Sequence, residues 1–360
     1  MVKLNVGVIF GGCSSEHDVS MVSGTAVISN LNKEKYNIIP IYIDKNGKWY
    51  KYNENIANIS ILKIGENIND KIEEINNIEK ILKKVDVIFP VLHGIGGEDG
   101  SIQGLFELFK VPYVGCGILS SSIGMDKVYT KIIFEKAGIK QAKYSYIRRY
   151  NGKYVYVDNE FNENVLSIDE ISKKIENNLR YPMFIKPSNS GSSVGINKAK
   201  NLEELKNAIE YASKFDKKIL IEEGIVGKEV ECAVLGNEDV IASCIGEIRP
   251  AEDFYTFDAK YNNNQSETLI PANISKEISE KIRTLAVKAF KAIDGKGLSR
   301  VDFFVNEETN ETYINEINTL PGFTTISMYP KLFEESGIQY TELLDKLIKL
   351  ALENSNSSNC

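Results

Sequence analysis

The side chains best suited to chemistry lie near the carboxyl end of the chain, on two strand-like segments joined by a polar turn. Arg300 and Asp302 are on the first segment, and Ile314, Glu316 and Asn318 are on the second. This pattern predicts a β-hairpin whose second strand carries its three named residues on one face, with Asp302 on the opposite arm. Two carboxylates and an amide oxygen suit Mg²⁺, so Asp302, Glu316 and Asn318 form a candidate metal site. The alternative is a surface hairpin with solvated charges, but Glu316 and Asn318 interrupt an apolar strand where burial is expected.

Three further loops bring polar side chains and glycines together at the ends of predicted strands. Glu16 follows strand 6–10 and a double glycine, His93 opens a glycine-rich loop after strand 86–92, and the serine-glycine loop 188–195 follows a strand that contains Lys186. Backbone N–H groups, hydroxyls and a lysine suit phosphate oxygens. Each loop also has a plainer interpretation: a carboxylate favoured by a helix dipole, a core histidine, and a flexible linker, respectively.

Composition narrows the class of protein. The chain has 360 residues, a net charge of −7 and five scattered cysteines without a CxxC pair. The length predicts two or three domains, and the apolar and charged fractions are typical of a soluble globular protein. We find no transmembrane-length apolar run and no signal-peptide pattern, and the cysteine usage favours a reducing cytoplasm. The negative charge and the lack of a basic stripe argue against nucleic-acid binding.

Strand and helix patterns alternate along most of the chain, which predicts an α/β protein built from three units, residues 1–120, 121–217 and 218–360. A long irregular segment, residues 250–271, contains several aromatic side chains and is predicted to be a lid. Helices are expected at 19–31, 66–84, 101–109, 125–137, 168–179, 202–215, 275–293 and 340–353.

Taken in order, several motifs resemble those of the ATP-grasp superfamily and, within it, the D-alanine–D-alanine ligase family. The resemblance covers nearly the whole chain. It implies an ATP-grasp fold, α+β in its ATP-binding part, behind an N-terminal Rossmann-like domain. The motifs are Gly11-Gly-Cys-Ser-Ser-Glu16-His-Asp-Val-Ser20, His93-Gly-x-x-Gly-Glu-Asp-Gly100, Met125-Asp-Lys127, Lys186-Pro-Ser-x-x-Gly-Ser-Ser-Val-Gly195, Ala259-Lys260-Tyr261, Arg300-Val-Asp302 and Asn315-Glu-Ile-Asn318-Thr-Leu-Pro-Gly322.

By this resemblance, ATP would lie between the second and third units. Its phosphates would be held by two lysines and by the serine loop, and its adenine and ribose by two glutamates. The metal site would hold two Mg²⁺, with Mn²⁺ as a substitute, on Asp302, Glu316 and Asn318. Where the family often has an aromatic residue, two positions after the first glutamate, this chain has Gly224. The implied nucleotide ligands are Lys127, Lys186, Ser190, Ser193, Glu222 and Glu229.

The resemblance also implies a two-step reaction, in which ATP phosphorylates the carboxylate of one D-alanine and the amine of a second D-alanine displaces the phosphate. Glu16 would hold the first ammonium beside His93, while Arg300 and the N–H of Gly322 would stabilise the oxyanion. Ser327, Met328 and Lys260 would contact substrate. Glu16, Ser192 and Tyr261 would join by hydrogen bonds to close the site, and the product would serve peptidoglycan synthesis.

The remaining alternatives concern the second substrate and the class of protein. Lys260-Tyr261 is typical of ligases that do not use D-lactate, and Ala259 and Met328 favour D-alanine over D-serine. A homodimer formed through the first unit is implied by the resemblance alone. A dehydrogenase with a dinucleotide at 11–15 is disfavoured because GxGxxG is absent. A non-catalytic ATP-binding module would not need the set Glu16, Ser192 and Tyr261.

Overall fold

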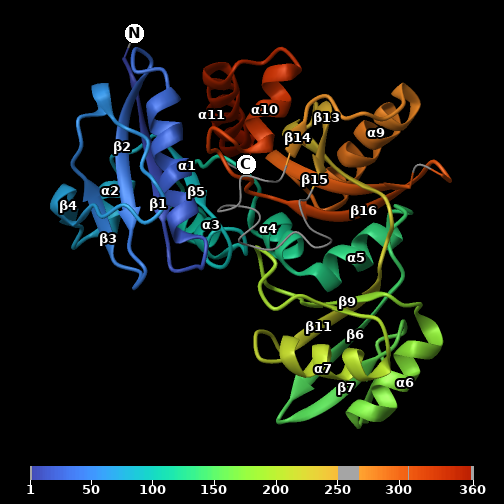
Figure 1. The fold of residues 1–360 in the computed structure, drawn as a ribbon. Coiled ribbons are helices and arrows are strands. Elements are labelled where there is room, and N and C mark those ends of the chain that lie inside the picture. Colours follow the sequence, from blue (N-terminus) through green and yellow to red (C-terminus); the bar gives the residue numbers. More distant parts are fainter. Residues whose placement is uncertain (1, 250–266, 307, 358–360) are drawn as a thin grey trace.

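The computed structural model describes residues 2–249, 267–306 and 308–357. Most of the predicted lid, including Lys260 and Tyr261, therefore lies outside the described residues. The described chain forms three sheets with helices packed around them, as the alternating pattern predicted (Figure 1). No helix in these described ranges is long and apolar enough to cross a membrane.

The first sheet has the strand order β4-β3-β2-β1-β5, with β1 parallel to both β2 and β5. β1 and β5 are almost entirely buried apolar runs, which is typical of parallel strands covered on both faces. The carboxyl ends of β1 and β5 lead into the loops that carry Glu16 and His93, so these loops lie at one edge of the sheet. The elements are β1 (Leu4–Gly11), α1 (His17–Asn30), β2 (Tyr36–Ile43), β3 (Trp49–Tyr52), β4 (Ile72–Glu74), α2 (Ile78–Leu82), β5 (Val87–Leu92) and α3 (Ser101–Phe109).

The second sheet is antiparallel, in the order β10-β9-β11-β6-β7-β8, with α6 and α7 packed on it (Figure 1). Two helices, α4 and α5, lead into it from the first unit. Between β9 and β10 lies the serine-glycine loop. The elements are α4 (Ile118–Met125), α5 (Lys127–Lys136), β6 (Tyr144–Tyr150), β7 (Lys153–Val157), β8 (Glu163–Leu166), α6 (Ile168–Asn178), β9 (Met183–Pro187), β10 (Asn197–Ala199), α7 (Leu202–Ala212) and β11 (Lys218–Glu223).

The third sheet, β14-β13-β12-β15-β16, is also antiparallel and ends in the predicted hairpin. One face of it packs on α9. The other carries the polar side chains of β12, β15 and β16. The elements are β12 (Lys228–Gly236), β13 (Ile241–Arg249), β14 (Glu267–Leu269), α9 (Lys276–Ala292), β15 (Gly297–Asn306), β16 (Glu311–Asn318), α10 (Met328–Glu335) and α11 (Tyr340–Ser357).

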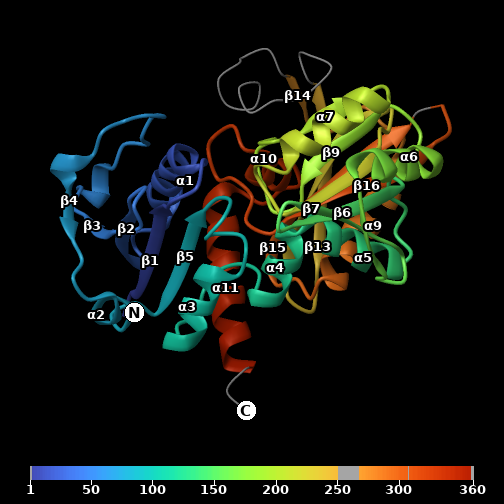
Figure 2. The same ribbon diagram turned by 90° about the horizontal axis from the view of Figure 1, so that it is seen from below.

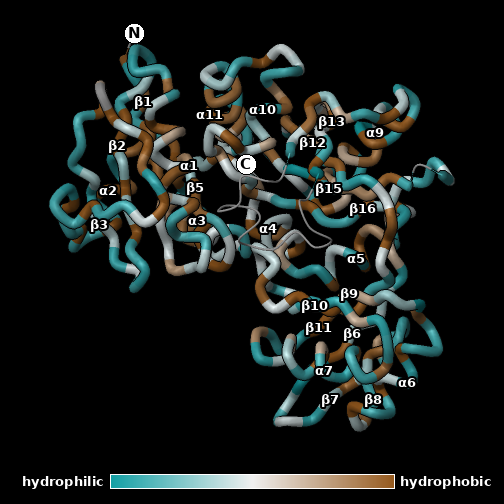
Figure 3. Tube along the Cα trace, viewed as in Figure 1, coloured by the Kyte–Doolittle hydropathy of each residue, from teal (hydrophilic) through white to brown (hydrophobic). Residues whose placement is uncertain are grey.

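The C-terminal helices join the first and third sheets into one core. In Figures 1 and 2, α11 lies beside the first sheet, and its Leu343, Leu344 and Leu347 are fully buried in the same apolar cluster as Val8 and Phe10 of β1. Figure 3 shows hydrophobic residues recurring along the strands of all three sheets, with polar stretches concentrated in the connecting loops. The first and third units therefore hold each other in place, which fixes the loops between them.

Two expectations about local structure are wrong. Residues 66–84 do not form one helix but a 3₁₀ turn (Asn69–Lys71), strand β4 and the short helix α2. On the hairpin, Ile314 does not share a face with Glu316 and Asn318, because the register shifts between Asp302 and Phe303: Asp302 pairs with Glu316, but Phe303 pairs with Ile314. The extra residue, Asn315, is a β-bulge that turns Ile314 into the apolar core and leaves Glu316 on the polar face.

The division into three units stays a prediction, and sheet membership bears on its second boundary. β11 is hydrogen-bonded to β9 and β6 in the second sheet. A division by sheets would therefore fall after Glu223 rather than between residues 217 and 218.

Candidate active site between the three sheets

One cavity of about 680 Å³ lies where the three units meet. It is lined by loops from the ends of β1 and β5, by the serine-glycine loop, by β11 and β12, and by the polar face of β15 and β16. Of the residues predicted to act in the site, only Lys260 and Tyr261, outside the described ranges, are not found in its wall. Those found are Glu16, His93, Lys127, Lys186, Ser190, Ser192, Ser193, Glu222, Glu229, Arg300, Asp302, Glu316, Asn318, Gly322, Ser327 and Met328.

Glu16 is held between two glycine loops that are far apart in the sequence. It occupies the N-cap position of α1 and is only 8% exposed. Its Oε1 accepts a hydrogen bond from the hydroxyl of Ser192. A Cβ on Gly94 would lie 2.7 Å from Glu16 Oε2, and a Cβ on Gly191 would lie 2.9 Å from the same atom. The absence of side chains at both glycines therefore allows the carboxylate to enter the site from α1.

His93 is buried, with both ring nitrogens near hydrogen-bond partners. Nδ1 lies 3.2 Å from the carbonyl oxygen of Leu320, and Nε2 lies 3.2 Å from the hydroxyl of Ser23. Burial lowers the pKa of His93, against the opposing effect of the Glu16 charge. The histidine thus lines the cavity and also connects β5 to the segment that follows the hairpin. It is therefore both a residue of the cavity wall and, as the alternative interpretation proposed, a buried histidine of the core.

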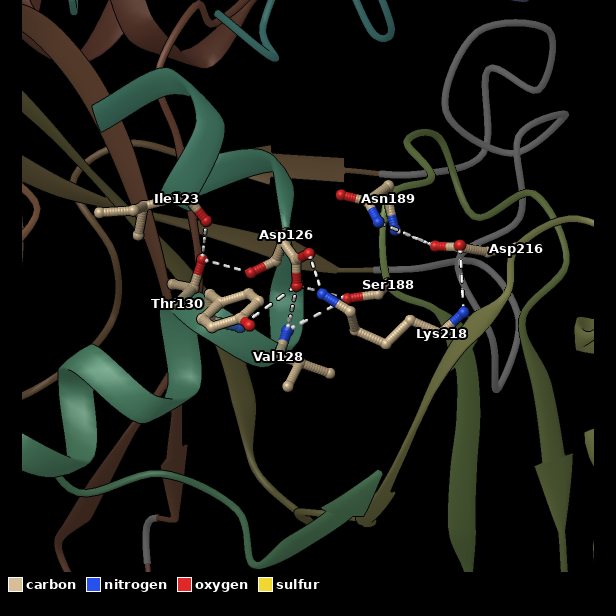
Figure 4. Close-up of polar contacts among 9 residues, drawn as sticks. Ile123, Asp126, Val128, Thr130, Ser188, Asn189, Asp216 and Lys218 are labelled. Carbon is tan, nitrogen blue, oxygen red and sulfur yellow. Dashed lines mark hydrogen bonds and ion pairs between the residues drawn. The ribbon is translucent and has the colours of Figure 1, made fainter. Parts of the chain in front are cut away.

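The base of the serine-glycine loop is fixed by a polar network (Figure 4). Asp126 caps α5 by accepting from the backbone N–H groups of Val128 and Tyr129, and it also accepts from the Ser188 hydroxyl and pairs with Lys218. On the other side, Asp216 Oδ2 accepts from the backbone N–H of Asn189 at 2.8 Å and from its side-chain amide at 3.0 Å. The loop therefore leaves β9 from an anchored position.

Beyond this anchor the loop lies over the cavity. Lys127 Nζ donates to the carbonyl oxygen of Ser190 at 2.6 Å. Ser192 and Ser193 both have positive φ values, 49° and 61°. This left-handed backbone brings the Ser192 hydroxyl to Glu16, so that the second unit contacts the first across the cavity.

Glu222 lies between two lysines at the end of β11. Its Oε1 pairs with Lys186 Nζ, and its Oε2 lies 2.8 Å from Lys131 Nζ. Burial alone would raise the pKa of Glu222, but the charges of Lys131 and Lys186 outweigh it and lower that pKa to about 2. Glu229 lies at the start of β12 on the cavity wall.

The polar face of the hairpin holds the predicted metal ligands. Asp302 and Glu316 are direct cross-strand partners, as are Arg300 and Asn318. Both carboxylate oxygens of Asp302 accept from Arg300, through Nε and Nη2 at 2.7 Å each, and Asn318 Oδ1 accepts from the N–H of Leu320. Among the described residues no group of three or more His, Cys, Asp or Glu side chains could hold a metal ion. The oxygen donors of Asp302, Glu316 and Asn318 are of the type that Mg²⁺ prefers. Arg300 is a cation that competes with a metal for the carboxylate of Asp302.

The segment after the hairpin closes the remaining wall. Gly322 packs against Ser327, whose hydroxyl lies 2.8 Å from that of Thr324. Ser327 is the N-cap residue of α10, and Met328 begins the helix, almost buried, against Gly246. The positive end of the α10 dipole is therefore at the cavity.

Several charged groups of this site were given no role by the sequence analysis. Glu98 lines the cavity, and its Oε2 accepts from the N–H of Gly94 at 2.6 Å. Burial and the nearby charge of Glu16 raise the pKa of Glu98 to about 8. Glu98 belongs to the glycine-rich motif after His93, so the sequence places it in the binding loop but gives it no role. Lys131 lies one helical turn after Lys127, a spacing that places both on one face of α5. Glu231 and Glu247 also line the cavity.

Comparison with known proteins shows which family the chain resembles. The family model for the D-ala D-ala ligase N-terminus matches residues 5–116, and that for the D-ala D-ala ligase C-terminus matches residues 133–349. The chain is 52% identical to a D-alanine–D-alanine ligase of Acetivibrio thermocellus, over 99% of this chain and 98% of the relative. It is 48% identical to a D-alanine–D-alanine ligase of Clostridium novyi, over 99% of this chain and 100% of the relative.

Solved structures are similar over the same length. The VanG D-Ala:D-Ser ligase of Enterococcus faecalis superposes with a TM-score of 0.83 at 38% identity, covering 97% of this chain and 100% of that one. The D-alanine–D-alanine ligase of Bacillus anthracis complexed with ATP superposes with a TM-score of 0.74 at 27% identity, covering 99% of this chain and 100% of that one.

Proposed function

This chain belongs to the D-alanine–D-alanine ligase family, and from that premise we propose how its cavity joins two D-alanine molecules with ATP. The chain is an ADP-forming ligase with the ATP-grasp fold, and ATP is one of its substrates. The D-serine alternative is not favoured, because the relatives of about 50% identity are D-alanine–D-alanine ligases. The roles of individual residues in the reaction are our proposal.

ATP occupies the part of the cavity between the second and third sheets. Lys127 and Lys186 offer positive charge to the phosphates, and the loop with Ser190 and Ser193 covers them with hydroxyls and N–H groups. Glu222 and Glu229 contact the adenine and the ribose. Phe184 lines the cavity, 3.1 Å from where a Cβ on Gly224 would stand, and supplies an aromatic face in place of the aromatic residue that the family often has at position 224.

Two Mg²⁺ ions fit the trio Asp302, Glu316 and Asn318, because all the donors are hard oxygens and acidic side chains outnumber basic ones around the cavity. The metals would neutralise charge on the triphosphate as it develops. The acidic side chains in the wall are Glu16, Glu98, Glu222, Glu223, Glu229, Glu231, Glu247, Asp302 and Glu316, and the basic ones are Lys127, Lys186, Lys228, Arg249 and Arg300.

The first D-alanine binds between the first and third units. Glu16 holds its ammonium, with His93 beside it. Its carboxylate oxygen attacks the γ-phosphorus and ADP leaves, giving an acyl phosphate. Arg300 is oriented by Asp302, which accepts from its Nε and Nη2. The oriented guanidinium and the N–H of Gly322 stabilise the oxygen that becomes negative in the second step.

The second D-alanine binds at the start of α10. Ser327 at the start of that helix holds its carboxylate, near the positive end of the helix dipole, and Met328 packs on its methyl group. Its amine attacks the acyl carbon, and the tetrahedral intermediate collapses with release of phosphate and of the amine proton. Lys260 and Tyr261, which lie outside the described residues, complete the substrate contacts and the closure.

Closure protects the acyl phosphate from water. The hydrogen bond between Ser192 and Glu16 joins the second unit to the first over the cavity, and Tyr261 would add the third unit to the same set. This contact is the link between nucleotide binding and substrate binding, since one partner lies on the phosphate loop and the other holds the ammonium.

We also propose a homodimer in the cytoplasm. Four large apolar side chains are exposed on α3 and at the start of α4, namely Leu108, Phe109, Ile118 and Leu119. Exposed apolar patches of this kind are typical of subunit interfaces. Light scattering of the purified protein tests this; a monomer at all concentrations would refute it.

The observation that carries the proposal is the convergence of all sixteen described site residues on one cavity wall. The test is phosphate release with ATP and D-alanine, alone or mixed with D-serine or D-lactate, with mass analysis of the product. D-alanyl-D-alanine as the dominant product supports it. A mixed D-alanyl-D-serine product would overturn the role of Met328, and bound ATP without turnover would indicate a non-catalytic module.

A further inference from the structure

Lys131 is a buried cation to which the proposed reaction gives no role. It lies on α5, one turn after Lys127, and its side chain is only 3% exposed. Its Nζ lies 2.8 Å from Glu222 Oε2 and 5.4 Å from the centre of the Tyr144 ring. A buried lysine requires a charged partner, and Glu222 supplies it.

Glu222 shares its charge between two lysines. Each of its carboxylate oxygens faces a different ammonium group, Lys186 at Oε1 and Lys131 at Oε2. Among these three side chains, two ammonium groups face one carboxylate, and the charges of Glu316 and Glu229 also act on Lys186. Burial alone would lower the pKa of Lys186, but the charge of Glu222 raises it above its ordinary value. Lys186 and Glu222 therefore both remain charged.

Lys131 does not face the nucleotide part of the cavity directly. Lys127, Lys186 and Glu222 line the main cavity, whereas Lys131 lines a neighbouring hollow of about 10 Å³ behind them. A hollow of that size holds at most one water molecule and no ligand. Lys131 can therefore affect the reaction only through the groups that it contacts.

We propose that Lys131 is a positioning residue that compensates the charge of Glu222, so that Lys186 retains its positive charge for the phosphates of ATP. Without Lys131, Glu222 and Lys186 form a neutral pair, and moving Lys186 toward a phosphate leaves a buried carboxylate uncompensated. With Lys131 in place, Glu222 stays paired when Lys186 turns to the nucleotide. The role of Lys131 rests on the proposed function only in the assignment of Lys186 to the phosphates.

The first experiment compares steady-state kinetics of Lys131→Met with those of the unaltered protein. We expect the KM for ATP to rise by about tenfold or more, with the KM values for D-alanine changed less than about twofold, since the D-alanine sites are on other units. Lys131→Arg, which keeps the charge, should recover most of the ATP affinity. Lys140→Met is the matched control, because Lys140 also pairs with a glutamate, Glu311, but at the surface. An unchanged ATP KM in folded Lys131→Met would overturn the inference.

A double variant separates charge compensation from a merely structural role. If Lys131 acts only through the charge of Glu222, then Glu222→Gln and Lys131→Met/Glu222→Gln should have ATP KM values within about twofold of each other. A much higher KM in the double variant would refute the inference. This comparison decides the question even where Lys131→Met alone fails to fold.

Direct ATP binding, measured by calorimetry with Mg²⁺ present, distinguishes this inference from the function itself. If the unaltered protein binds ATP but does not form a dipeptide, the proposed function fails. Weaker ATP binding by Lys131→Met would still support the role of Lys131, and equal binding would refute it.

Discussion

Replacing Glu98 by Gln should remove a large part of the pH dependence of stability. Burial and the charge of Glu16 raise the pKa of Glu98 from 4.5 to about 8. A raised carboxyl pKa means that the folded state binds a proton that the unfolded state has released. The stabilisation that Glu98 contributes is complete below its pKa in the unfolded state, and it is lost as the pH rises to its pKa in the folded state. Between about pH 6 and about pH 9 the loss is roughly 2.7 kcal/mol, because about two pH units of this interval lie below the folded pKa and each is worth about 1.36 kcal/mol.

The assay is urea unfolding of both proteins at these two pH values. Glutamine keeps an acceptor oxygen for the N–H of Gly94 but cannot ionise, so Glu98→Gln should lose less of its free energy of unfolding on the alkaline side. Glu107→Gln, on α3, is the control for a glutamate outside the cavity. Glu16→Gln should reduce the pH dependence in part, because it removes one of the charges that raise the pKa of Glu98. Equal pH dependence in Glu98→Gln and the unaltered protein would refute the argument.

Three further predictions concern the anchor, the closure and the metals. Asp126→Ala should destabilise the fold by about 3 kcal/mol, since it removes the cap of α5 and leaves Lys218 unpaired; urea unfolding checks this, and a loss below about 0.5 kcal/mol would contradict it. Gly191→Ala places a Cβ 2.9 Å from Glu16 Oε2 and should raise the KM values for both substrates without changing the circular dichroism spectrum, whereas unchanged kinetics would count against the closed arrangement. Glu316→Gln should abolish phosphate release while the fold persists, and chelation of Mg²⁺ by EDTA should do the same reversibly; normal turnover in either case would exclude the metal assignment.

The hairpin shows which side-chain positions can be predicted from the alternation of faces along a strand, and which cannot. Alternation correctly predicted that Asp302 and Glu316 would meet across the strands. It was wrong for Ile314, because Asn315 adds one residue to the strand and shifts the phase of every side chain before it. The sequence does contain a signal: Asn315 and Glu316 stand together between Ile314 and Ile317, and two adjacent polar residues do not fit a strictly alternating strand.

The prediction of one helix over residues 66–84 was wrong for a different reason. Ile68, Ile72, Ile75 and Ile78 recur every three or four residues, which imitates the period of an amphipathic helix. The asparagines between them favour turns and caps, and Asn77 does accept a hydrogen bond from Lys80 as the cap of the short helix α2. Local hydrogen bonding by asparagine therefore overrode the apolar period.

The sequence was enough to predict which residues line the site, but not which of their side chains contact one another. Motifs identified Glu16, Lys186 and Glu222 individually, whereas the pairing of Glu222 with two lysines depends on how α5 lies against β11, which no local pattern encodes. The same holds for Glu16, whose carboxylate lies against Gly94 and Gly191 from two different units. A Cβ at either glycine would collide with this one carboxylate in its present position. Gly94 leaves room for the carboxylate within the first unit, and Gly191 lets the second unit come close to it. The glycines that looked like flexible turns in the sequence thus determine how closely the phosphate loop can approach the residue proposed to hold the ammonium.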